Sequence, residues 1–221
     1  MRLEINLNEA EEHFKLTPEQ LDSLRELGNI GSGNAITALS EIINRRIEMS
    51  LTGVKIIPFW DLSKIFPDLD LEIIGICSNI EGEPNLSLLQ IFTKDSIINL
   101  INLISEENAN FLKKISDIND LDNLTKSIIS EIGNILAGHY ASSLANLMSI
   151  KLIPSTPNLA LDTIGAISNS LIARYSKTTD YLIIINTEMN IEDLKINGIF
   201  CFIPSIETLE TIFKLIDSVL K

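Results

Sequence analysis

Cysteine and histidine, the residues that most often build disulfides and metal sites, are scarce in this chain. Among 221 residues there are two cysteines and two histidines. Cys77 and Cys201 each lie in an apolar, strand-like run, so we expect reduced core residues rather than a disulfide. His13 and His139 have no second His or Cys at ligand spacing, so we expect no metal site on this chain. A chain of this length buries a normal core without either kind of cross-link.

Positive charge is also scarce: the chain has 17 Lys and Arg residues but 30 Asp and Glu residues, which gives a formal net charge of −13. This balance argues against a nucleic-acid partner, which requires a basic surface. No apolar run reaches the roughly 18 residues that cross a bilayer. The N-terminal segment MRLEINLNEAEEHF is acidic and lacks the apolar stretch of a signal peptide. We therefore expect a cytoplasmic protein with no membrane span, whose partner carries a basic patch.

The sequence contains an internal repeat. At an offset of 105 residues, ELGNIGSGNAITALSEII (26–43) aligns with EIGNILAGHYASSLANLM (131–148), with identity at six of 18 positions. The shared pattern is E-x-G-N-I-x-x-G. A pattern of this length, present twice in one chain, indicates duplication.

The two halves also share their order of predicted elements. Periodicity predicts long helices over 18–46 and 120–147, and each half closes with a further helix. Leu21, Leu24, Leu27 and Ile30 form the apolar stripe of the first helix. The β-prone runs are 47–59, 72–79 and 86–92 in the first half and 149–155, 181–187 and 196–203 in the second.

We predict an α+β fold with internal duplication and a pseudo-two-fold relation between the halves. A mixed or antiparallel sheet carries two long related helices, and these hold the E-x-x-N motifs. Because no Pro-, Gly- or Ser-rich linker separates the halves, we expect one domain over 1–221. Repeat one spans 17–107 and repeat two spans 118–221.

Each copy of the motif places three polar side chains on one helical face. They are Asp22, Glu26 and Asn29 in the first copy and Ser127, Glu131 and Asn134 in the second. A Glu and an Asn supply no nucleophile, and a carboxamide is no base near neutral pH. An Asn side chain can hold a water, because it accepts one hydrogen bond and donates another. Such a strip suits the positioning of water against a phosphoryl group that belongs to another molecule.

Glycines surround the motif at a cost of about 1 kcal/mol each in a helix interior. They are Gly28, Gly31 and Gly33 in the first copy and Gly133 and Gly138 in the second. Two explanations stand side by side: the glycines let another protein approach the Asn, or they let the two long helices pack closely.

At these residues the sequence resembles the CheC family of chemotaxis phosphatases, which includes CheX and the phosphatase part of FliY. The family signature is [D/S]-x₃-E-x₂-N-x₂₂-P. The second copy matches throughout and ends at Pro157, whereas the first copy has Thr52 at the proline position. The resemblance covers the chain from about Thr17 onward. Thr52 is expected to weaken the geometry of the first site rather than abolish its chemistry.

The resemblance implies dephosphorylation of the response regulator CheY in chemotaxis adaptation. Asn29 and Asn134 would orient the attacking water, while Glu26 and Glu131 would pair with the active-site lysine of the regulator. The Mg²⁺ would belong to CheY, so this chain would need no cofactor of its own.

The resemblance implies a second partner, the deamidase CheD. Its candidate binding element is a helix predicted over 159–175, with Asp162 near the exposed start. The first half offers only the shorter segment 59–66 at this place. The alternative is a covering helix whose Asp simply faces solvent.

Three other interpretations stay open. The chain could be a duplicated scaffold whose Glu and Asn are ordinary surface residues. It could be a module that binds CheY-P or CheD without hydrolysis. It could also be a flagellar switch protein of the FliY kind, which carries a further C-terminal domain.

Overall fold

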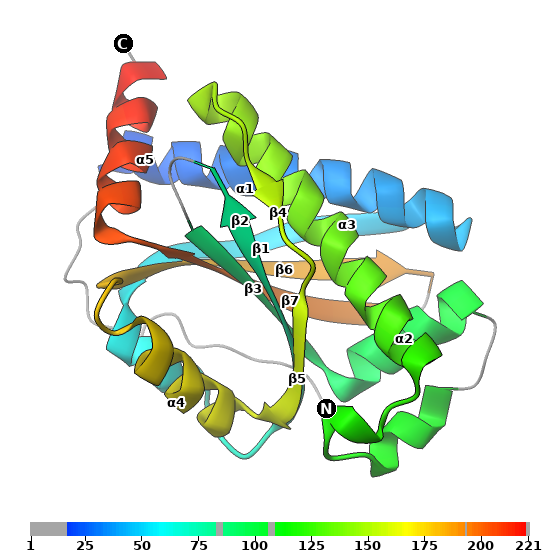
Figure 1. Ribbon diagram of the computed structural model, residues 1–221. Coiled ribbons are helices and arrows are strands. Elements are labelled where there is room, and N and C mark those ends of the chain that lie inside the picture. The colour runs from blue at the N-terminus through cyan, green and yellow to red at the C-terminus, as the bar shows by residue number, and fades with distance from the viewer. Residues whose placement is uncertain (1–16, 83–85, 106–108, 193, 220–221) are drawn as a thin grey trace.

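Seven strands form one sheet, with helices on both faces (Figure 1). The computed structural model describes residues 17–82, 86–105, 109–192 and 194–219. The helices are α1 (Pro18–Ile43), α2 (Lys94–Ser105), α3 (Asn123–Met148), α4 (Ile164–Tyr175) and α5 (Ile206–Val219), with 3₁₀ segments η1 (Phe59–Ile65), η2 (Ala109–Lys114) and η3 (Ile118–Asp120). The strands are β1 (Ile47–Pro58), β2 (Glu72–Glu81), β3 (Leu86–Thr93), β4 (Ile153–Pro154), β5 (Asn158–Thr163), β6 (Tyr181–Ile191) and β7 (Leu194–Pro204). None of the helices in these ranges is both long and apolar enough to cross a bilayer.

The sheet runs in the order β1-β6-β7-β3-β2-β4, with β5 also paired to β2. All of these pairings are antiparallel, which decides between the two predicted sheet types. Apart from β4, the strands lie in the order β1-β6-β7-β3-β2-β5. Exchanging each of these six strands with its counterpart in the other half, β1 with β5, β2 with β6 and β3 with β7, reverses this order. A two-fold relation between the halves requires this order, so the topology fits the proposed duplication with repeats 17–107 and 118–221.

Alternate residues of the strands supply two separate cores. Ile74, Ile76 and Ile185 face the core that contains side chains of α1, α2, α3 and α5. The residues that alternate with them along the strands, such as Ile73 and Leu89, point to the opposite face and pack with α4 and η1. The two motif helices therefore share one side of the sheet, and α4 lies on the other.

The two long helices are confirmed, and each has 26 residues. Thr17 begins α1 with a reciprocal capping box to Gln20, and Asp122 begins α3 by accepting a hydrogen bond from the Thr125 N–H. Both helices end in a left-handed residue, Asn44 at φ 49° and Ser149 at φ 54°.

Helices α1 and α3 pack directly against each other around Tyr140. A Cβ on Gly31 would lie 2.6 Å from Tyr140 Cδ1, so this position requires glycine. The Tyr140 hydroxyl shares a hydrogen bond of 2.6 Å with Ser32 Oγ, and its ring lies 4.6 Å from that of Phe200. Burial raises the pKa of Tyr140, so the phenol stays neutral. This contact fixes the position of one motif helix relative to the other.

Tyr140→Phe is expected to lower the free energy of unfolding by about 1–2 kcal/mol, because the buried Ser32 hydroxyl loses its partner. Adding Ser32→Ala should restore part of the loss. Urea unfolding of the two single variants and the double variant measures the coupling. Additive losses would show that the hydroxyls do not act as a pair.

The helix predicted over 159–175 is wrong in its first five residues. Residues 159–163 belong to β5, where Ile73 of β2 pairs with Asp162, and α4 begins at Ile164 with Thr163 as its N-cap. Leu161 is buried whereas Asp162 is exposed, which is the alternation of a strand. Asp162 therefore lies at the end of a strand, where its Oδ1 accepts the Thr163 N–H at 2.7 Å.

Two further expectations need correction. The predicted run 149–155 contributes only the two residues of β4. Ile30, expected in the core stripe of the first helix, is 47% exposed, although Leu24 of the same stripe is fully buried. The side chain of Leu27 and the acidic segment 1–16, with His13, lie outside the described residues.

Candidate functional site

The motif side chains lie on the outer face of α1 and α3. Glu26, Asn29 and Glu131 are exposed and Asn134 is half-buried. Within the described part of the chain, none of these four side chains forms a hydrogen bond or an ion pair. An Asn without an internal partner keeps its carbonyl and its NH₂ available to an outside molecule. Both carboxamides are therefore accessible to an outside molecule, Asn29 more so than Asn134.

The residue one turn upstream differs between the two copies. Asp22 is exposed, and its carboxylate lies 3.4 Å from Arg25 of the same helix. Ser127 is also exposed and donates its hydroxyl proton to the Asn123 carbonyl at 2.8 Å. Ser127 therefore offers lone pairs to a partner, whereas Asp22 offers a charge.

The five glycines of the motif helices divide into two groups. A Cβ on Gly28 would lie 2.5 Å from Leu51 Cδ1, and a Cβ on Gly133 would lie 2.4 Å from Ile76 Cγ2. Gly33 and Gly138, one turn after each Asn, have no atom within 4 Å of the added Cβ. Close packing of the two long helices explains Gly31, whereas Gly28 and Gly133 let their helices pack closely on the sheet. Gly33 and Gly138 leave open space beside each Asn, and the approach of another protein there stays a prediction.

Gly133→Ala is expected to lower the free energy of unfolding by about 1–3 kcal/mol, because the branched Ile76 side chain cannot move aside without shifting the helix from the sheet. Gly138→Ala is the matched control in the same helix and should raise the free energy of unfolding by about 0.5–1 kcal/mol. Urea unfolding measures both. Equal changes in the free energy of unfolding at the two positions would contradict the division of the glycines into two groups.

Thr52 lies within the edge strand β1, whereas Pro157 lies just before β5. In β1 the register shifts between Leu51 and Gly53, and the hydroxyl of the intervening Thr52 donates to the Asn186 carbonyl at 3.1 Å. In the second half, Pro157 lies between β4 and β5, where its missing N–H costs no ladder hydrogen bond. Leu51 packs under Gly28, so the bulge lies directly beneath the first motif.

An apolar groove of about 310 Å³ adjoins the second motif. Its lining residues are Ile42, Ile104, Ser127, Ile128, Glu131, Ile132 and Ile135. This groove was not predicted from the sequence, because Ile42 and Ile104 come from α1 and α2. The sequence held one sign of an apolar surface here: an Ile directly follows the Asn in both copies, as Ile30 and Ile135. Ile30 had been expected in the core.

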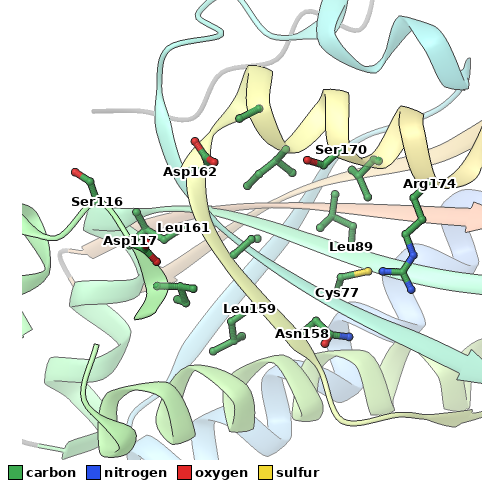
Figure 2. Close-up of a pocket in the computed structure, with 16 residues that line it drawn as sticks. Cys77, Leu89, Ser116, Asp117, Asn158, Leu159, Leu161, Asp162, Ser170 and Arg174 are labelled. Carbon is green, nitrogen blue, oxygen red and sulfur yellow. The ribbon is translucent and has the colours of Figure 1, made fainter. Parts of the chain in front are cut away.

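A larger pocket of about 450 Å³ follows β5 beside α4. Figure 2 shows Asp162 near Ser116 and Asp117 on one side of β5 and Cys77 beside Arg174 on the other. Burial raises the pKa of the Cys77 thiol, and both cysteines are free. Asp162 lines this pocket rather than the groove beside Glu131.

Comparison with known proteins connects the motifs to one family. A family model described as the CheC-like family matches residues 19–50 and 124–160, which contain both motifs. The CheY-P phosphatase CheC of Bacillus subtilis is 34% identical over 176 residues, which cover 77% of this chain and 80% of that protein. This chain belongs to the CheC-like family.

The wider relatives of this CheC-like chain include flagellar proteins. The flagellar motor switch phosphatase FliY of B. subtilis is 26% identical over 147 residues, which cover 66% of this chain and 36% of that protein. The crystal structure of Thermotoga maritima FliY superposes with a TM-score of 0.71 at 21% identity, covering 93% of this chain and 99% of that one. A chain in the crystal structure of the FliM-SpeE complex from H. pylori gives a TM-score of 0.63 at 12% identity, covering 92% of this chain and 97% of that one. At these identities the two structures show a common fold.

The described residues of this CheC-like chain contain no cluster of three or more His, Cys, Asp or Glu side chains suited to a metal ion. The motif offers two carboxylates and one amide in the first copy, and one carboxylate, one hydroxyl and one amide in the second. That set suits the binding of a protein surface and of a water better than the ligation of a cation.

Proposed function

We propose that this CheC-like protein removes the phosphoryl group from the aspartyl phosphate of CheY-P in chemotaxis. One observation carries the proposal: two Glu–Asn pairs, free of partners among the described residues, face outward from sister helices. The chain that displays them is 34% identical to a CheY-P phosphatase. A Glu–Asn pair, which supplies no nucleophile, on a chain whose described residues hold no metal cluster fits chemistry whose reactive phosphorus comes with the substrate.

The reaction assigns one role to each Asn. The Asn29 or Asn134 carboxamide holds a water in line with the bond between phosphorus and the aspartyl oxygen. The water oxygen bonds to phosphorus, the bond from phosphorus to the aspartyl oxygen breaks, and the protons of the water stay on the released phosphate or pass to solvent. The products are inorganic phosphate and the free carboxylate of the regulator. The Mg²⁺ that neutralises the phosphoryl oxygens is part of the regulator's own site.

The remaining motif residues bind the regulator. Glu26 and Glu131 lie one turn before each Asn, so a carboxylate meets a lysine of the regulator when the carboxamide meets the water. Asp22 and Ser127 extend the contact by one further turn. The acidic chain, with its net charge of −13, favours a partner with a basic patch at this place.

The test is the decay of CheY labelled with acetyl phosphate, measured with and without the protein at a catalytic concentration. The proposal expects phosphate release many-fold above the spontaneous rate, with turnover of more than one CheY per chain. A complex with CheY-P that leaves the decay rate unchanged would show a binding module instead of an enzyme.

We further propose the deamidase CheD as a second partner, at the pocket beside α4. Asp162 is exposed at this pocket, which supports a contact separate from the two motifs. Binding of CheD to the Asp162→Lys variant tests this. Unchanged affinity would leave α4 as a covering helix and Asp162 as a solvent-facing residue.

A further inference from the structure

The apolar groove beside the second motif has walls from both halves of the chain. Ile42 is the penultimate residue of α1, Ile104 lies in α2, and the other lining residues belong to α3. Ile42 is 47% exposed, so much of its side chain is open to solvent among the described residues. An apolar hollow open to water is typical of a binding surface.

The groove is continuous with the proposed catalytic surface. Ser127 and Glu131 belong to both, and Ile135 directly follows Asn134 in the chain. A regulator that brings its phosphorus to Asn134 and its lysine to Glu131 therefore lies over the mouth of the groove. We propose that the groove receives an apolar side chain of the docked CheY, and that Ile42 sets the affinity of the second site.

The equivalent positions of the first motif differ in chemistry. At the repeat offset of 105 residues, Ser23 corresponds to Ile128. Ser23 uses its hydroxyl to bond the Glu19 carbonyl at 3.0 Å. The first site thus offers a small polar residue where the second offers an isoleucine wall. The two sites are expected to hold the same regulator with different affinity, the second more tightly.

This inference rests on the proposed function, so its test isolates one site at a time. Ile42→Ser is combined with Asn29→Ala, which leaves only the second site active, and separately with Asn134→Ala, which leaves only the first. In the Asn29→Ala background, KM for CheY-P should rise about ten-fold with little change in kcat, because apolar area at Ile42 is no longer buried on docking. In the Asn134→Ala background, KM should not change.

Two further variants exclude a general effect on the fold. Ile206→Ser is the matched control, since Ile206 is also 47% exposed but lies at the start of α5, outside the groove lining. It should leave KM unchanged in both backgrounds. Ile128→Ser gives the second motif the residue of the first and should reproduce the rise in KM seen with Ile42→Ser.

Titration with CheY activated by beryllofluoride, a phosphoryl mimic, measures docking without hydrolysis. The Ile42→Ser variant should lose about ten-fold in affinity at one of two sites. An unchanged affinity, an affinity that rises because residues 1–16 had filled the groove, or equal KM changes in both backgrounds would each overturn the inference. Loss of affinity in a protein without Asn-dependent hydrolysis would instead refute the proposed function and leave the groove as a docking site.

Discussion

Replacement of both Asn29 and Asn134 by alanine is expected to slow the protein-catalysed decay of CheY-P by about two orders of magnitude or more, the cost of removing one positioned catalytic donor in other enzymes. The reason is geometric, because alanine can neither accept nor donate the hydrogen bonds that hold the water in line. Phosphate release at limiting protein concentration measures the loss.

The same substitutions should leave the fold and the docking of CheY intact. Neither Asn bonds another described residue, and alanine is the better helix former by roughly 0.5 kcal/mol. Affinity for beryllofluoride-activated CheY should stay within a few-fold of the parent, because Glu26 and Glu131 remain. Unfolding curves and titrations serve as controls. A double variant as active as the parent would place the chemistry elsewhere.

Substitution of Gly33 and Gly138 by leucine is expected to lower kcat/KM for CheY-P by about 30-fold or more, roughly the effect of misplacing reacting groups by about 1 Å. Each glycine lies one turn beyond an Asn on the same face, where an added side chain meets no atom of this protein within 4 Å of Cβ. The space is therefore open for a partner, and leucine would hold the phosphoryl group away from the carboxamide. Steady-state kinetics on CheY-P measure this effect.

The leucine variants should be more stable than the parent, by about 0.5–1 kcal/mol at each position, because glycine is a poor helix former. Alanine at the same positions is the size control. It gives the same gain in helix propensity with far less bulk, so most of the activity should remain. Equal losses for alanine and leucine would indicate that flexibility of the helix matters, rather than clearance.

The sequence was sufficient to predict the elements whose signals are local. The two long helices carry their own caps and periodicity, and the two copies of the motif place polar residues on one helical face. Those signals act within a few residues, so a single sequence contains them.

The incorrect predictions concern residues whose structure depends on contacts with parts of the chain that are far away in the sequence. The segment 159–163 became a strand because β2 offers it a hydrogen-bonding edge, a pairing between residues about 90 positions apart. The groove beside Glu131 was not predicted because Ile42 and Ile104 reach it only through tertiary packing. Ile30 was assigned to the core because it is apolar and in phase with Leu24. Its exposure beside Asn29 departs from the hydrophobic pattern, as functional surfaces often do.

The central claim is that a carboxamide directs water at a phosphorus atom that another protein carries. Its most direct test is the single-turnover decay of CheY-P under saturating protein, with Asn134→Asp compared with Asn134 in the Asn29→Ala background. Aspartate has nearly the same shape, accepts hydrogen bonds only and adds a negative charge near the phosphoryl oxygens. We predict that its rate falls to that of Asn134→Ala. A rate equal to or above that of the Asn134 protein would show that a base, rather than a positioned carboxamide, drives the reaction.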